Sequence, residues 1–174
     1  QTLDIIYVDN GTPSNEDSWE QSVKWSWETH KCKILKFDAA VCLARAWNAG
    51  FKMTYAQYHP DGRVLILNND LIFKQQGWLD QFEAELQKEE VGIVGISGMS
   101  WFFSPFVQGS IFAFRPKMFY AGGEVGFDER FEFTCEETDF NTRIQRDGYQ
   151  MVQLPHLKDK YVVHLEGATR NHYR

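Results

Sequence analysis

Residues 127–148 read FDERFEFTCEETDFNTRIQRDG and combine a high density of acids with several aromatic residues. Six carboxylates fall between Asp128 and Asp139, and phenylalanines interrupt them. The second half of the stretch is typical of a helix that starts near Thr134 and stops at Gly148. Because a partly buried, apolar wall raises the pKa of a nearby carboxyl group, the stretch predicts an acid–base site at the start of a helix.

Three acids in the first turn of this helix are candidates for a catalytic base: Glu136, Glu137 and Asp139. Thr134 and Glu137 have the spacing of a capping box, which would give Glu137 a purely structural role. Asp139 and Arg143 stand four residues apart in the acid-first order of a helix ion pair. Adjacent acids also repel each other, which keeps one of them basic. The residues alone therefore leave open which of the three acids is the base.

Apolar strands and helical segments alternate along the rest of the chain. Strands are expected at residues 3–8, 34–37, 63–67, 91–97, 110–114, 151–154 and 161–165. A helix over residues 38–49 would begin at Asp38 and end before Gly50, and Trp78, Phe82 and Leu86 share one face of another helix. The alternation predicts an α/β fold with a mostly parallel central sheet flanked by helices. We expect residues 1–174 to form a single domain, which can bury roughly two-thirds of its unfolded surface.

Polar side chains follow three of the expected strands at the point where each strand ends. Asp9 follows the first strand, Asp70 closes the segment LNND after the third, and His164 lies near the end of the last. Ligands bind beyond the carboxyl ends of strands in such sheets, so these side chains are expected to converge. A carboxylate there can share a hard divalent cation with phosphate oxygens, and imidazole is a common metal ligand. The segments around Asp9 and around Asp70 are equally consistent with ordinary turns.

Composition excludes several classes of function. A net charge of −6 argues against a protein that binds nucleic-acid backbones, which would present a basic face. No apolar run approaches the ~20 residues of a membrane span, and no signal peptide is recognisable. Three cysteines without metal-ligand spacing favour a reducing, cytoplasmic compartment. The chain has neither a phosphate-binding glycine loop nor a serine nucleophile elbow.

Taken together, these motifs resemble the GT-A-fold glycosyltransferases of family 2, especially the rhamnosyltransferase-like members. The resemblance covers nearly the whole chain, in the family's order, at residues 3–12, 44–50, 67–70, 77–79, 126–131, 136–149 and 164–169. Two features differ from the family pattern. The position of the catalytic base carries Glu137 where the family usually has Asp, and no counterpart of the family's first strand precedes Gln1.

The resemblance implies a metal-dependent, inverting transfer of a hexosyl or rhamnosyl unit from a UDP- or dTDP-sugar to a hydroxyl of a glycan or glycolipid. It implies Mn²⁺ or Mg²⁺ as the cation and a part in polysaccharide biosynthesis. Glu137 would be the base, with Glu136 or Asp139 as alternatives. Asp70 and His164 would form the metal site. The nucleotide side would comprise Asp9, Asn10, Asn69 and Arg143, and Asp9 would contact the pyrimidine ring.

The resemblance also defines the expected partners and the competing interpretations. A nucleotide-sugar donor and a carbohydrate or lipid-linked acceptor are expected, nucleic acid is not, and a peripheral membrane contact stays open. A degenerate, non-catalytic module that binds sugars or nucleotides is one alternative. A sugar nucleotidyltransferase is another, although the glycine- and lysine-rich loop of such enzymes is not found in the sequence.

Overall fold

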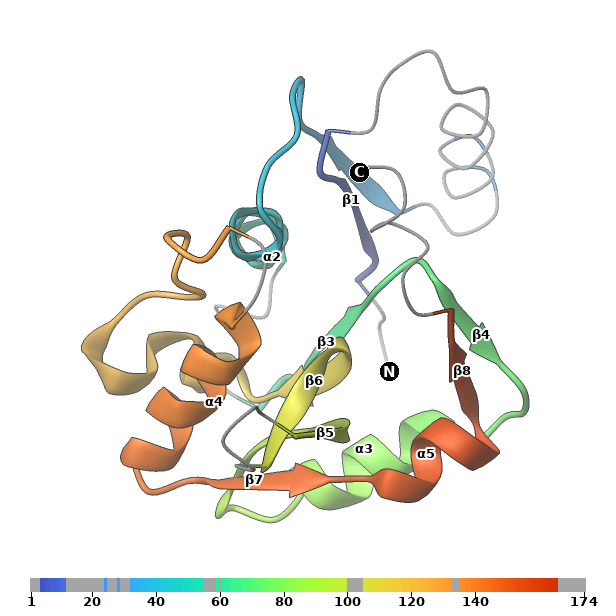
Figure 1. Ribbon diagram of the computed structural model, residues 1–174, viewed down its shortest axis with the longest axis vertical. Helices are drawn as coiled ribbons and strands as arrows, with labels where there is room; N and C mark the ends of the chain where they lie inside the picture. The colour runs from blue at the N-terminus through green and yellow to red at the C-terminus, as the bar shows by residue number, and fades with distance from the viewer. Residues whose placement is uncertain are drawn as a thin grey trace.

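The computed structural model describes residues 4–11, 24, 28, 32–54, 59, 61–99, 105–132 and 135–165. The strands are β1 (Ile6–Asp9), β2 (Lys33–Lys36), β3 (Val64–Leu67), β4 (Leu71–Phe73), β5 (Val91–Met99), β6 (Pro105–Phe114), β7 (Gln150–Gln153) and β8 (Val162–His164). The helices are α2 (Leu43–Met53), α3 (Trp78–Leu86), the 3-10 segment η2 (Pro116–Gly123), α4 (Glu136–Arg146) and α5 (Pro155–Lys160). Figure 1 shows how these elements are arranged.

The central sheet has four strands in the order β3-β6-β5-β7. β6 runs antiparallel to both of its neighbours, and only β5 and β7 pair in parallel. The expectation of a mostly parallel sheet is therefore wrong, because the sheet is mixed. Residues 100–104 separate β5 from β6, and so short a connection cannot return the chain in parallel, which takes a dozen or more residues.

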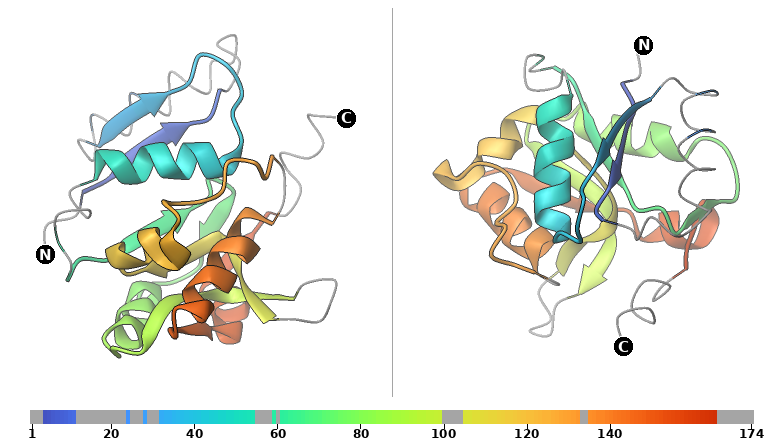
Figure 2. Two further views of the ribbon diagram at one scale, coloured as in Figure 1. Left: turned by 90° about the vertical axis from the view of Figure 1, so that its left-hand side faces the viewer. Right: turned by 90° about the horizontal axis from the view of Figure 1, so that it is seen from above.

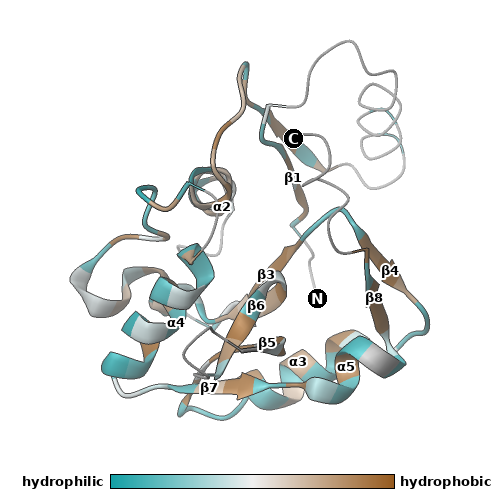
Figure 3. Ribbon diagram, in the orientation of Figure 1, coloured by the Kyte–Doolittle hydropathy of each residue, from teal (hydrophilic) through white to brown (hydrophobic). Residues whose placement is uncertain are grey.

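Helices cover both faces of this sheet, as expected for an α/β fold (Figures 1 and 2). On one face, α2, η2 and α4 enclose a core with Phe51, Phe114, Phe119, Phe127 and Phe140. On the other face, α3 and α5 pack against a second, smaller core around Phe82 and Leu157. The strands are accordingly mostly apolar in Figure 3, whereas α4 is largely hydrophilic outside its buried stripe. This arrangement leaves the first turn of α4 beside β6.

β1 and β2 form a separate, parallel two-stranded sheet. The helix that follows it differs from the expected one, because α2 begins at Leu43 rather than at Asp38 and continues through Gly50 to Met53. Residues before α2 fold back on the end of β1, where the Val41 amide donates to the Asn10 carbonyl. Gly50 does not end the helix. A Cβ there would lie 3.0 Å from Val8, so the glycine lets α2 pack closely on β1.

Three short elements were not expected from the sequence: β4, η2 and α5. β4 pairs antiparallel with β8 in a two-stranded ribbon that extends away from the central sheet (Figure 1). This pairing matters for function because it places Leu71 opposite His164. Among the residues that the structure describes, no helix has the length and apolar character needed to cross a bilayer.

Candidate functional site

Asp70 and His164 lie side by side although 94 positions separate them in the sequence. The register of β4 and β8 brings them together, and the Leu165 amide donates to the Asp70 carbonyl at 2.9 Å. His164 Nε2 is 3.2 Å from Asp70 Oδ1, and both side chains are largely buried. The contact is close without hydrogen-bond geometry, since Asp70 Oδ1 and His164 Nδ1 are buried without a hydrogen-bond partner.

A carboxylate oxygen and an imidazole nitrogen at this distance fit a divalent cation. Such ions often take only one or two carboxylates from the protein and complete their coordination with substrate phosphates and water. Within the described part of the chain, no group of three or more His, Cys, Asp or Glu side chains is placed to hold an ion. A cation bound by Asp70 and His164 would therefore depend on oxygen ligands from a bound substrate.

The loop between β3 and β4 connects this pair to β6. The Asn68 amide donates to the Ser110 carbonyl at 2.9 Å, and Ser110 Oγ is buried without a partner. Asn69, assigned to the nucleotide side, is exposed in the turn next to Asp70. Gly109, which precedes Ser110 on β6, lies against the first turn of α4. A Cβ added at position 109 would be 3.5 Å from Glu137 Cδ. Residues 109 and 110 thus link the Asp70 loop to Glu137.

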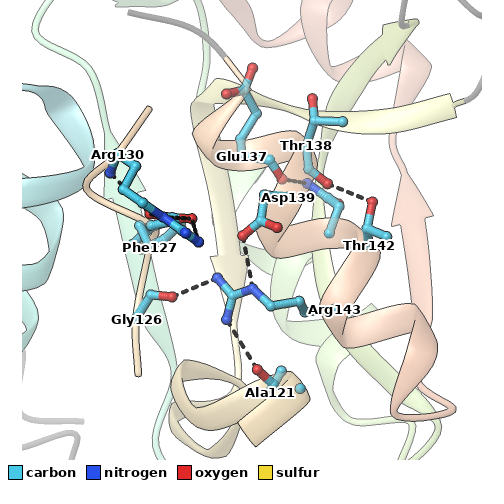
Figure 4. Close-up of polar contacts among 12 residues, drawn as sticks. Ala121, Gly126, Phe127, Arg130, Glu137, Thr138, Asp139, Thr142 and Arg143 are labelled. Atoms are coloured by element: carbon cyan, nitrogen blue, oxygen red, sulfur yellow. Dashed lines mark hydrogen bonds and ion pairs between the residues drawn. The ribbon is translucent and has the colours of Figure 1, made fainter. Parts of the chain in front are cut away.

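Glu137 stands in the first turn of α4 against Gly109 of β6, a glycine that Trp47 also approaches. Burial raises the pKa of its carboxyl group, the bond from its own backbone amide opposes this, and the charge of Glu136 raises the pKa further. Figure 4 shows the Glu137 side chain directed away from the Arg143 cluster described below. A half-buried carboxyl group with a raised pKa, and with no arginine partner among the described residues, is suited to accept a proton.

Glu136 is more deeply buried, with 4% exposure, and its Oε2 has no hydrogen-bond partner. Burial raises its pKa as well. Thr134, the predicted cap of this helix, lies outside the described residues. Cys135 directly precedes α4 in a left-handed conformation (φ 77°), and its side chain makes no capping hydrogen bond.

Asp139 and Arg143 occupy another face of α4 (Figure 4). Arg143 Nε donates to Asp139 Oδ2 at 2.8 Å, which confirms the expected helix ion pair. The guanidinium also donates to the carbonyls of Ala121 (3.0 Å) and Gly126 (2.6 Å). A polar cavity of about 210 Å³ beside this cluster is lined by Gly122, Glu124, Asp128, Arg130, Asp139, Arg143 and Arg146. Its lining includes neither Glu137 nor Asp70, so this cavity is separate from Glu137 and from the Asp70–His164 pair.

Asp9 is at the carboxyl end of β1, with 3% exposure. Its Oδ1 accepts a hydrogen bond from the Gly11 amide at 3.1 Å, as in an Asx turn. The Asn10 side chain donates to the Val41 carbonyl at 3.4 Å and so holds the loop before α2. Both residues belong to the β1·β2 sheet, whereas the Asp70 loop leaves the central sheet.

Two buried asparagines tie helices α2 and α4 to neighbouring backbone, and the sequence did not single them out for that role. Asn48, on α2, exchanges hydrogen bonds with both backbone groups of Phe127 and donates to Glu129 Oε1. Asn141, on α4, does the same for the backbone of Val107 on β6. Both asparagines are on the apolar faces of their helices. A polar residue on such a face is the sequence signal that could have identified their role.

Comparisons with known proteins support the fold. No family model and no curated protein matches the sequence. The structure is similar to the mannosyltransferase PcManGT from Pyrobaculum calidifontis in complex with GDP-Man and Mn²⁺. The TM-score is 0.65 at 20% sequence identity, over 88% of this chain and 46% of the mannosyltransferase. The chain therefore shares the fold of that mannosyltransferase, and it spans less than half the length of that enzyme.

Proposed function

We propose that the protein is a cation-dependent, inverting glycosyltransferase that moves a sugar from a nucleoside-diphosphate donor to an acceptor hydroxyl. One observation carries the proposal: Asp70 lies beside His164, its loop bonds to Ser110, and the preceding residue Gly109 lies against Glu137. Leaving-group stabilisation and proton removal require two such groups on opposite sides of a reacting carbon. The similarity to a mannosyltransferase fold supports the same class of reaction.

The cation site of the proposed enzyme comprises Asp70 Oδ1 and His164 Nε2. A divalent cation bound there would neutralise the charge of the departing diphosphate. Asn69 is next to this pair in an exposed turn and is positioned to contact the donor. Asp9, at the end of β1, would accept a hydrogen bond from a ring N–H of the base. Uracil, thymine and guanine all present such a donor, so the proposal does not choose among them.

Glu137 would act as the base. Its carboxylate takes the proton of the acceptor hydroxyl while the acceptor oxygen forms a bond to the anomeric carbon. The bond from that carbon to the diphosphate oxygen breaks in the same displacement, and the nucleoside diphosphate leaves with the electron pair. The raised pKa of Glu137 increases its proton affinity toward the working pH. No covalent intermediate is needed, so no nucleophilic side chain is required.

The direct test is turnover with a panel of UDP-, dTDP- and GDP-sugars and simple glycoside acceptors, with Mn²⁺ or with a chelator. The proposal expects release of nucleoside diphosphate that requires both the cation and the acceptor. NMR of the product should show an anomeric configuration opposite to that of the donor. A product with the donor's configuration would contradict the role given to Glu137. Cation-dependent binding without any turnover would favour a non-catalytic binding module.

A further inference from the structure

We propose that Asn141 is the positioning residue of Glu137: its side-chain amide ties the first turn of α4 to β6 and thereby fixes the place of the Glu137 carboxyl group. The catalytic meaning of this inference rests on the proposed function, whereas the contacts that carry it do not.

The Asn141 amide makes three hydrogen bonds, which use both of its N–H donors and one acceptor position of Oδ1. Nδ2 donates to the carbonyl of Glu137 at 2.5 Å and to that of Val107 at 3.3 Å, while Oδ1 accepts from the Val107 amide at 3.4 Å. The side chain is 2% exposed. Asn141 thus pairs with the backbone N–H and C=O of Val107 as a neighbouring strand would. The same side-chain amide also bonds to the backbone of Glu137.

Val107 stands where β6 leaves its regular pairing with β5. Gly95 pairs with Phe112 and Ser97 with Val107, so β5 advances two residues (95 to 97) while β6 advances five (107 to 112). The extra residues of β6 form a bulge, a feature that commonly re-aims side chains next to active sites. The bulge contains Gly109, whose Cβ position is 3.1 Å from Trp47 Cη2 and 3.5 Å from Glu137 Cδ. The carboxyl group of Glu137 therefore rests against the same bulge that Asn141 anchors.

A second constraint acts just before Glu137 in the chain. Cys135 has a φ of 77°, the only positive value at a residue other than glycine in the described part of the chain. Such a conformation is unfavourable for a residue with a Cβ and persists only where surrounding contacts hold it. Asn141 supplies one such contact to this turn, through its bond to the Glu137 carbonyl two residues after Cys135.

The electrostatic surroundings of Glu137 are simple. Glu136, on the same helix, acts on it through its charge, whereas α2 presents Trp47 and β6 presents Gly109. Neither Trp47 nor Gly109 titrates, so the contact with them affects the Glu137 carboxyl group through desolvation. If the Asn141 bonds to β6 are lost, the carboxyl group can move toward water, and its pKa should fall toward the ordinary value.

The test compares Asn141→Ser with Thr142→Ala. A serine at 141 can keep a bond to the carbonyl four residues earlier but cannot reach Val107. Thr142 is the next residue of α4, and its Oγ1 donates the same kind of bond to the Thr138 carbonyl at 2.8 Å. The structure gives no hydrogen bond between the Thr142 side chain and the described residues of β6. NMR titration of ¹³C-labelled glutamate should show a lower Glu137 pKa in Asn141→Ser and an unchanged one in Thr142→Ala. An unchanged pKa in Asn141→Ser, or equal shifts in both variants, would overturn the proposal.

Cys135 supplies a second pair of variants, should Asn141→Ser fold poorly. Glycine adopts a positive φ without strain, whereas valine resists it. Cys135→Gly should leave the Glu137 pKa unchanged, and Cys135→Val should lower it. The same pKa in both variants would contradict the idea that the first turn of α4 is held in place by backbone constraints.

Turnover separates this inference from the proposed function. In an active enzyme, Asn141→Ser should lower kcat by roughly 10–100-fold with little change in KM for the donor, because a shift of about 1 Å costs up to 10²-fold. If the wild-type protein transfers no sugar, the proposed function fails, and the Glu137 pKa in Asn141→Ser still decides the role of Asn141.

Discussion

Glu137 and Asp139 are two residues apart on α4 yet have opposite surroundings. Glu137 rests against Gly109, which Trp47 also approaches, and burial raises the pKa of its carboxyl group. Asp139 faces Arg143, which holds it in an ion pair and bonds two backbone carbonyls as well. Helix α4 thus presents Glu137, whose carboxyl group is desolvated and has no arginine partner among the described residues. It also presents Asp139, whose charge is neutralised by Arg143. Only the first is suited to exchange a proton with a substrate.

The contrast extends to the neighbours of each acid. Glu136, beside Glu137, is buried with an oxygen that lacks a partner. Asp128, on the Arg143 side of the helix, has its pKa lowered to about 2, first by the hydrogen bonds that it accepts from Arg130. The carboxyl groups of Glu136 and Glu137 are therefore desolvated, as is common in active sites, whereas Asp128 and Asp139 are paired with arginines.

The largest expected difference between the two faces is in turnover. Glu137→Gln removes the proposed base and should lower kcat by roughly 10²–10⁴-fold while donor affinity stays the same. Asp139→Asn keeps Glu137 in place and should change kcat only a few-fold. Steady-state kinetics with the donor identified by the panel measure both. Equal losses in the two variants would remove the distinction between the faces.

Stability should show the reverse order. Arg143→Met leaves Asp139 without its partner and two carbonyls without their donor, which should destabilise the fold by about 3 kcal/mol. Glu137→Gln removes no ion pair and should not destabilise it. Urea unfolding of both variants gives the comparison. If Arg143→Met were as stable as the wild type, the ion pair would not be the structural element inferred here.

Glu136 should affect stability in a pH-dependent way. Its pKa is raised above the ordinary 4.5 by burial, so the folded protein binds the proton more tightly than the unfolded chain. Stability should therefore fall as pH rises from 4.5 through the folded-state pKa. Glu136→Gln should be more stable at pH 7 by about 1 kcal/mol, a Tm higher by roughly 2–4 °C, and the difference should vanish below pH 4.5.

Asp128 should show the opposite sign with a smaller effect. Its lowered pKa contributes stability above the ordinary 3.8, and that contribution is lost as pH falls toward 2. Asp128→Asn should lower Tm slightly at pH 7, because Arg130 is exposed and its pairing is weakened by solvent. Thermal unfolding at pH 7 and near pH 2 checks this, and salt should reduce the difference at pH 7.

The sequence predicted the elements that carry the site better than the contacts that assemble it. Strand-end positions identified Asp70 and His164, because an apolar run that stops at a polar residue is a local pattern. Their pairing depends on β4, a three-residue strand too short to be recognised before its partner is known. The direction of β6 and its bulge depend on pairing between distant residues, as does the role of Asn141.

The central claim is that Asp70 and His164 bind a cation that holds the donor, while Glu137 acts only in the chemical step. Calorimetric titration of the wild type, Asp70→Asn and Glu137→Gln with the sugar nucleotide, with and without Mn²⁺, tests it most directly. The account predicts Mn²⁺-dependent binding to the wild type, equal binding to Glu137→Gln and its loss in Asp70→Asn. Binding that is unaffected by a chelator, or is as strong in Asp70→Asn as in the wild type, would contradict it.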